Sequence, residues 1–71
     1  MQDPPAIIVV NGTERTITPG TTLRALIELL GLAGQPVAAE VNRAVVPFRQ
    51  HPATTLRHGD RVELVTLVGG G

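Results

Sequence analysis

The pair Asn11-Gly12, placed directly after an apolar run, is the sequence feature that most restricts the fold. Both residues accept positive φ, so Asn-Gly is the strongest short signal for a two-residue hairpin turn. The run before it, residues 6–10, is rich in β-branched side chains. We therefore predict a strand over residues 6–10 and a second over about 15–18, ended by Pro19-Gly20, so that the fold opens with a β-hairpin.

A change of hydrophobic period after the hairpin predicts one helix over residues 23–30. Four apolar residues recur at i, i+3, i+4 and i+7, namely Leu23, Leu26, Ile27 and Leu30. That spacing places them on one helix face, which we expect to lie across the apolar face of the hairpin. A threonine at 21 or 22 can cap the free N–H groups at the start, and Gly31 suits a left-handed C-cap.

The second half of the chain predicts three further strands, over residues 37–41, 44–46 and 61–67. Asn42-Arg43 forms the turn between the first two. Residues 48–55 contain turn formers with little periodicity, so we expect a loop there, followed by an anchoring Leu56 and a tight turn. Three residues of the third strand are expected to face inward, namely Val37, Ala39 and Val41.

The order strand-strand-helix-strand-strand-strand is the β-grasp arrangement of ubiquitin-like proteins. The predicted fold class is therefore α+β, with a mixed sheet of about five strands and one main helix packed across it. We expect a single domain over residues 1–71, with a flexible glycine tail at 69–71.

Composition argues against several functional classes. A chain of 71 residues buries only about 60% of the surface that its unfolded form exposes, so it lacks the walls of a deep catalytic cleft. Six arginines balance six scattered carboxylates, and Phe48 is the single aromatic residue, which argues against nucleic-acid binding. No cysteine or lysine is present to act as a covalent nucleophile. We expect a protein that is not an enzyme.

The sequence shows no targeting signal, so we expect the protein in the cytoplasm. The N-terminal residues 1–5 have no basic region and no cleavable apolar stretch, so secretion is not expected. No segment approaches the roughly 20 apolar residues that span a bilayer, so no membrane association is expected.

The last predicted strand has an unusual outer face. Strand residues alternate between faces, so Val62 and Leu64 point inward while Val65 and Leu67 point outward beside the tail. Scattered surface hydrophobes are common, but contiguous exposed apolar side chains usually mark an interaction site. We predict that residues 65–68 and the first two tail glycines bind partner proteins, namely Val65, Thr66, Leu67, Val68, Gly69 and Gly70.

The glycines at the end of the chain suggest how it could take part in chemistry. Without Cβ atoms, Gly69 to Gly71 can enter a narrow channel and reach roughly 10 Å beyond the sheet. A terminal carboxylate is ionised at neutral pH and is a poor electrophile until another enzyme activates it with ATP. A frayed terminus or a cloning scar is the alternative. We predict that the Gly71 carboxylate is the reacting group of a carried substrate.

The two histidines do not predict a metal site. His51 and His58 are seven residues apart, in a predicted loop and turn, with no third ligand or nucleophile suggested. We interpret both as surface residues and expect no bound metal.

Several segments in order resemble the ThiS family of sulfur carriers in thiamin thiazole biosynthesis. They cover nearly the whole chain, about residues 6–71, and comprise Val10-Asn11-Gly12, Thr21-Thr22-Leu23, Val41-Asn42, Val45-Val46-Pro47, residues 59–65 and the terminal glycines. Family members commonly show Val-Pro-Arg after the fourth strand and end in Gly-Gly. Here Phe48 separates Pro47 from Arg49, and Gly71 is a third glycine.

The resemblance implies that three partner proteins would act on the chain one after another. A ThiF-like adenylyltransferase would use Mg-ATP to adenylate Gly71, and a persulfide donor would convert the adenylate to a thiocarboxylate. Thiazole synthase, ThiG, would accept the sulfur. No cofactor would be bound to the chain itself.

Three alternatives remain open at the level of sequence. A MoaD-type subunit of molybdopterin synthase shares the tail, although Thr66-Leu67-Val68 stands where prolines often precede its glycines. Another ubiquitin-like carrier could serve tRNA thiolation or protein conjugation. A β-grasp binding module with an inert tail belongs to a different class, which deletion of Gly70-Gly71 would distinguish.

Overall fold

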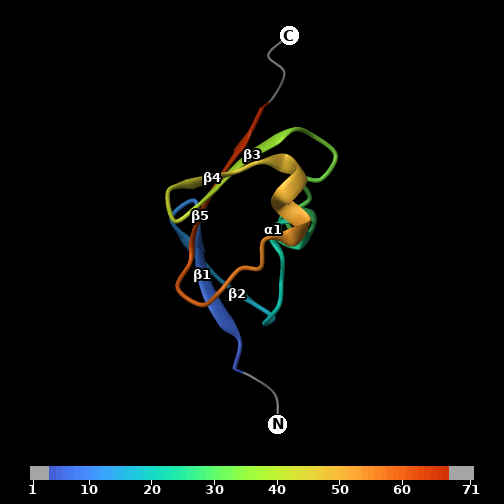
Figure 1. Cartoon of the computed structure of the whole chain (residues 1–71). Coiled ribbons are helices and arrows are strands. Elements are labelled where there is room, and N and C mark those ends of the chain that lie inside the picture. Colours follow the sequence, from blue (N-terminus) through green and yellow to red (C-terminus); the bar gives the residue numbers. More distant parts are fainter. Residues whose placement is uncertain (1–3, 68–71) are drawn as a thin grey trace.

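A five-stranded mixed sheet with one α-helix on one face forms the fold (Figure 1). The computed structural model describes residues 4–67. The elements in chain order are β1 (Ala6–Val10), β2 (Thr13–Ile17), α1 (Leu23–Leu29), β3 (Val37–Val41), β4 (Ala44–Val46), the 3-10 helix η1 (Phe48–Ala53) and β5 (Arg61–Thr66). The strand order is β2-β1-β5-β3-β4, with β5 parallel to β1 and antiparallel to β3. This confirms the predicted α+β class and its order of strands and helix.

The opening hairpin turns at Asn11-Gly12, as predicted, with φ angles of 49° and 83°. Strand β2 begins earlier than the predicted 15–18, because a two-residue turn brings the chain directly into pairing, and Thr13 lies opposite Val10. A second turn of the same kind lies at Asn42-Arg43, where φ is 51° and 70°.

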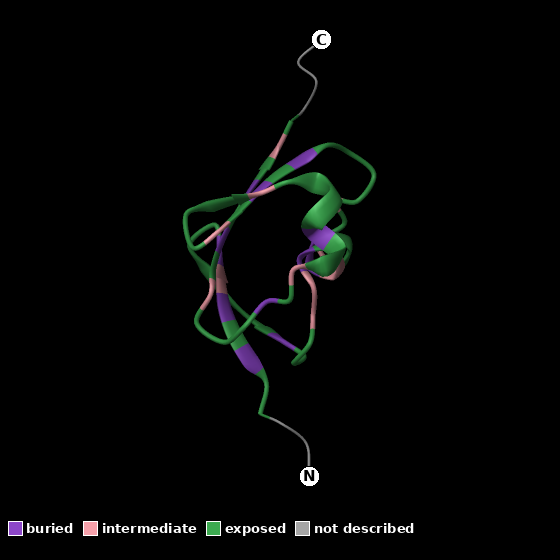
Figure 2. Cartoon of the chain, in the orientation of Figure 1, coloured by how far each residue is buried: buried purple, intermediate pink, exposed green. Residues whose placement is uncertain are grey.

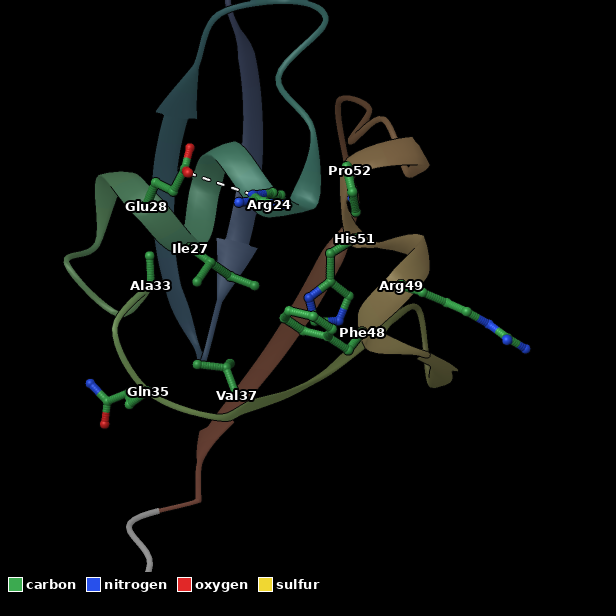
Figure 3. Close-up of a pocket in the computed structure, with 10 residues that line it drawn as sticks. All are labelled: Arg24, Ile27, Glu28, Ala33, Gln35, Val37, Phe48, Arg49, His51 and Pro52. Carbon is green, nitrogen blue, oxygen red and sulfur yellow. Dashed lines mark ion pairs between the residues drawn. The ribbon is translucent and has the colours of Figure 1, made fainter.

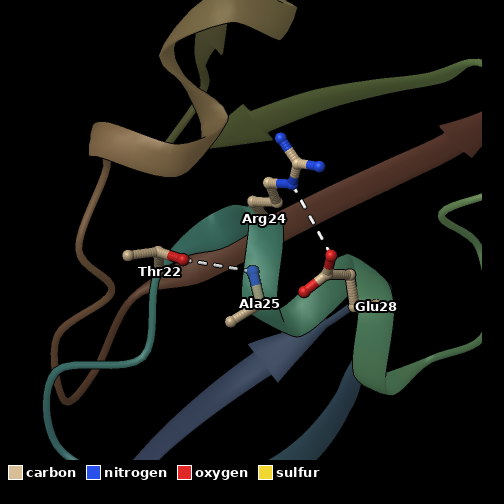
Figure 4. A network of polar contacts seen from close by, with 4 residues as sticks. All are labelled: Thr22, Arg24, Ala25 and Glu28. Carbon is tan, nitrogen blue, oxygen red and sulfur yellow. Dashed lines mark hydrogen bonds and ion pairs between the residues drawn. The ribbon is translucent and has the colours of Figure 1, made fainter.

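Helix α1 is held at its start by Thr22. The Thr22 hydroxyl accepts a hydrogen bond of 3.1 Å from the Ala25 backbone N–H (Figure 4). In the same turn, Arg24 Nε lies 3.6 Å from a carboxylate oxygen of Glu28, which is one turn further along the helix. The helix ends one residue before the predicted Leu30, and Gly31 follows in the left-handed region, as its C-cap prediction required.

The core lies between α1 and the inner face of the sheet, and buried segments alternate with exposed ones along the strands (Figure 2). Leu56 is buried at 2% exposure and anchors the segment before β5, as predicted. The helix contributes Leu23, Leu26 and Ile27 to this core. The other buried apolar residues are Ala6, Ile8, Val10, Ile17, Val37, Ala39, Val62 and Leu64.

The loop predicted over residues 48–55 is wrong for most of its length, since η1 occupies Phe48–Ala53. Pro47 accepts a hydrogen bond of 2.8 Å from the Gln50 N–H, which closes its first turn. Turn-forming residues are compatible with a short 3-10 helix, whose period of three places Phe48 above His51. Their rings meet edge to face, with centroids 5.5 Å apart.

Candidate functional site

Strand β5 lies in the middle of the sheet and leads into the C-terminal residues. Its beginning is held by Asn42, whose side-chain oxygen accepts from the Arg61 N–H at 2.9 Å. The amide nitrogen of Asn42 donates to Asp60 at 3.0 Å, and the other oxygen of Asp60 accepts from the Arg57 N–H at 2.8 Å. These bonds order the Gly59-Asp60 turn from which β5 starts.

Further along, the side chain of Asn11 holds β5 from the opposite side. Its oxygen accepts from the Leu64 N–H at 2.8 Å, and its nitrogen donates to the Leu64 carbonyl at 3.1 Å. The side-chain amide thus bonds both backbone groups of one β5 residue, as a neighbouring strand would. The sequence indicated Asn11 and Asn42 only as turn residues, because contacts to partners 53 and 19 positions away leave no local signal.

The outer face of β5 carries exposed apolar side chains next to its C-terminal end. Val65 is 58% exposed and Leu67 is 53% exposed, as predicted for residues that alternate with buried Val62 and Leu64. Pairing of β3 with β5 places the exposed Ala38 directly beside Val65. We call Ala38, Val65 and Leu67 the outer patch. Contiguous apolar surface of this kind suits a protein partner.

Two carboxylates border the outer patch. Glu40 on β3 lies opposite Glu63 on β5, and both are exposed on the same sheet face. Within residues 4–67 neither forms an ion pair, since the pair found there joins Arg24 to Glu28. Like charges directly across a sheet are destabilising. The outer patch therefore has an acidic border that a basic partner side chain would neutralise.

The predicted partner-binding residues differ in their placement. Val65 and Leu67 lie together on the outer face. Thr66 is half-buried and lies opposite Val37, so its side chain is on the helix side of the sheet. The remaining predicted residues lie outside the described part of the chain, namely Val68, Gly69, Gly70 and the reacting Gly71.

The interpretation of His51 as a surface residue is wrong. Its side chain is 3% exposed, and Nε2 lies 3.0 Å from the Val46 carbonyl, to which it donates. η1 folds the ring under Phe48 and against the sheet, which the loop prediction did not anticipate. His58 is exposed, as predicted, and its Nδ1 accepts from the Ile7 N–H at 3.0 Å. Both histidines have structural roles.

A cavity of about 290 Å³ lies on the helix side, between α1, the segment before β3 and η1 (Figure 3). Ile27, Val37 and Phe48 supply apolar surface, and the Arg24–Glu28 ion pair stands at its edge. Figure 3 shows the Arg49 side chain pointing away from the other lining residues. The two lining side chains that could act in catalysis are already engaged, Glu28 with Arg24 and His51 with the Val46 carbonyl, so the outer face of β5 is the stronger candidate site.

Two further features are absent from residues 4–67. No cluster of three or more histidine, aspartate or glutamate side chains in this part of the chain could hold a metal ion. None of the helices described is long and apolar enough to cross a membrane.

Comparison with known families and structures adds information about the whole chain. The model of the ThiS family matches residues 8–71. The crystal structure of the thiamine biosynthesis protein ThiS from Geobacter metallireducens superposes with a TM-score of 0.77 at 31% sequence identity. The match covers 92% of this chain and 99% of that protein.

Two curated relatives are thiazole synthases. The proteins from Paramagnetospirillum magneticum and Magnetococcus marinus are 36% and 41% identical over 64 residues, which is 90% of this chain. The chain spans about a fifth of the length of these relatives, since the match covers 20% of each. The uncharacterized protein ycf40 of Porphyra purpurea is 31% identical, with 90% of each chain covered.

Proposed function

The chain belongs to the ThiS family, and from this premise we propose that it carries sulfur for thiazole formation in thiamin biosynthesis. The sulfur is held as a thiocarboxylate on Gly71. The observation that carries the proposal is the outer patch, which exposes Val65 and Leu67 on the strand that leads to the terminal glycines. The chain acts as a co-substrate of partner enzymes, not as an enzyme.

The proposed chemistry activates a carboxylate that is otherwise unreactive. A ThiF-like adenylyltransferase transfers AMP from Mg-ATP to the Gly71 carboxylate, with release of pyrophosphate. The terminal sulfur of a persulfide donor then attacks the acyl carbon and displaces AMP, which gives an acyl disulfide. A thiol cleaves the S–S bond, leaving the thiocarboxylate on this chain and a disulfide on the donor. The thiols belong to partner proteins, because this sequence contains no cysteine.

The chain's own contribution is recognition and delivery. The outer patch gives each partner an apolar surface on a strand fixed by Asn11 and Asn42, so the terminus starts from a defined position. Glycines at 69–71 offer no side chain to obstruct a narrow channel or attack at the carbonyl carbon. The surface that partners recognise is therefore separated from the reacting carbonyl carbon by a short segment that ends in glycines.

The sulfur acceptor is proposed to be a thiazole synthase of the ThiG type. Relatives of this chain include two thiazole synthases in which the matched segment is a fifth of the protein. This supports the thiamin pathway over the molybdopterin alternative.

The test is the intact mass of the purified chain after incubation with Mg-ATP, a ThiF-like enzyme and a persulfide source. We expect a gain equal to the exchange of one oxygen for sulfur, located in the C-terminal peptide. A chain synthesised with a Gly71 carboxamide is the matched control, because it keeps every residue but has no carboxylate to activate. An identical mass gain in the carboxamide would contradict the proposal.

A truncation tests the role of the terminal glycines. Removal of Gly70-Gly71 leaves a single glycine at the end of the chain. We expect thiazole formation with the reconstituted enzymes to stop in this variant. Thiazole formation that survived this deletion would leave the domain as a binding module with an inert tail.

A further inference from the structure

The second half of β5 has a neighbouring strand on one side only. Its pairing with β1 consists of Val9 with Arg61 and Val10 with Val62, after which the chain turns away at Asn11-Gly12. Strand β5 continues to Thr66, and Figure 1 shows it extending beyond the β1–β2 turn. On the other side β3 remains paired up to Thr66.

The hydrogen bonds show which backbone groups face the open side. Residues 62 and 64 face β1, because the Asn11 N–H donates to the Val62 carbonyl at 2.9 Å and the Asn11 side chain bonds Leu64. Residues 61 and 67 face β3, because the Arg61 carbonyl and the Leu67 N–H bond Asn42 and Pro36, which flank that strand, at 2.7 and 3.0 Å.

Antiparallel pairing alternates these directions residue by residue. The N–H and C=O of Thr66 therefore point to the open side. There, no backbone in the described part of the chain pairs with them.

This edge lacks the charged side chains that protect strand edges from pairing. Charged side chains and very short strands are the usual protections. The outer strand β2 includes Glu14 and Arg15, and the outer strand β4 has only three residues. The segment 65–67 is uncharged, and its two outward side chains belong to the outer patch.

The Asn11 side chain indicates what the open edge accepts. At Leu64 it acts as one residue of an antiparallel strand would, donating one bond and accepting one in the line of β1. The next pair of backbone groups in that direction is at Thr66. An extended peptide placed beyond Asn11 would continue the pattern with its own N–H and C=O groups.

We propose that the adenylating enzyme adds an extended segment to the sheet at Thr66, in line with β1. Backbone hydrogen bonds to Thr66 would supplement the apolar contacts of the outer patch. Thr66 lies five residues before Gly71, so a strand held there would fix the direction in which the chain enters the enzyme. The inference rests on the proposed function only for the identity of the partner.

The test replaces one backbone N–H by oxygen in the full chain made by chemical synthesis. An ester at Thr66 removes the donor on the open edge and leaves every side chain intact. An ester at Val45 is the matched control, because alternation along β4 points its N–H away from β3 to a free edge. Each ester also makes the carbonyl of the preceding residue, Val65 or Ala44, a weaker hydrogen-bond acceptor. Both of these carbonyls face β3, so the two variants should lose a similar amount of unfolding free energy.

We expect the Thr66 ester to bind the adenylating enzyme about 2- to 13-fold more weakly than the Val45 ester, the equivalent of one hydrogen bond. Titration calorimetry gives the dissociation constants, and urea unfolding checks that the two esters are equally stable. Hydrogen exchange provides an independent reading on the unmodified chain. The Thr66 N–H should be protected in the complex, while the Val45 N–H exchanges rapidly with or without the enzyme.

Each contrary result has a definite meaning. Equal affinities of the two esters, with the unmodified chain adenylated normally, would overturn the added strand and leave the carrier function in place. Failure to adenylate the unmodified chain would reject the proposed function and, with it, this partner. Sedimentation that shows a dimer, lost in the Thr66 ester, would identify the occupant as a second copy and also overturn the inference.

Discussion

Glu40 lies directly opposite Glu63 in the pairing of β3 with β5, so two exposed carboxylates face each other across the outer side of the sheet. Like charges at such positions repel, and the repulsion is not offset by an ion pair to either group within residues 4–67. The pair borders the outer patch. The loss of unfolding free energy that this pair causes in the free chain can be measured separately from its contribution to binding in a complex.

Replacing Glu63→Gln should stabilise the free chain by about 0.2–1 kcal/mol, because it removes the repulsion from Glu40. Urea unfolding at low ionic strength measures the gain, which should shrink in 1 M salt, where charges are screened within about 3 Å. Glu14→Gln is the control, since Glu14 lies opposite the apolar Val9. A double substitution of Glu40 and Glu63 should gain less than the sum of the two singles. Strict additivity would show that the carboxylates do not interact.

Replacing Asn11→Gly should destabilise the chain by about 1–3 kcal/mol, since it removes two hydrogen bonds to Leu64 and keeps the positive φ of the turn. Asn11→Asp retains an acceptor for the Leu64 N–H but cannot donate to the carbonyl, so its loss should be smaller. Thermal or urea unfolding ranks the three chains. A glycine variant as stable as the parent would show that the turn alone, not the contact with β5, determines the role of this residue.

Replacing both Val65→Gln and Leu67→Gln should raise the KM for adenylation at least tenfold while unfolding changes little, because both side chains are largely exposed. Leu29→Gln is the matched control, since Leu29 is exposed on the helix, away from the outer patch. Equal effects of the helix and strand substitutions on KM would exclude the outer patch as the docking surface.

Replacing His51→Ala should cost about 1–3 kcal/mol, because the Val46 carbonyl loses a buried donor. His58→Ala should cost less, since the exposed Ile7 N–H can bond water instead. Neither change should lower the yield of thiocarboxylate at temperatures where both variants are folded. A folded variant of either histidine that lost sulfur loading would assign that side chain a role beyond structure.

Local sequence determined most of the architecture. Asn11-Gly12 specified the first turn, the spacing from Leu23 to Leu30 specified the helix face, and alternation along residues 61–67 identified the exposed Val65 and Leu67. Each is a short-range property, in which neighbouring side chains select the backbone conformation or the face to be buried. The β-grasp order followed from the sequence of these elements.

Tertiary packing decided the features that local patterns could not reveal. Residues 48–55 looked like a loop because 3-10 helices have weak periodicity, and His51 became buried only when η1 packed against the sheet. Asn11 and Asn42 were recognised as turn residues, but their side chains bond β5 across long sequence separations.

The open edge at Thr66 likewise depends on how far β1 extends beside β5, which only strand register defines. The sequence alone therefore determined the elements and the exposed side chains near the terminal glycines. The tertiary structure decided how firmly β5 is held and which side of it is left free, because hydrogen bonds between distant segments set both.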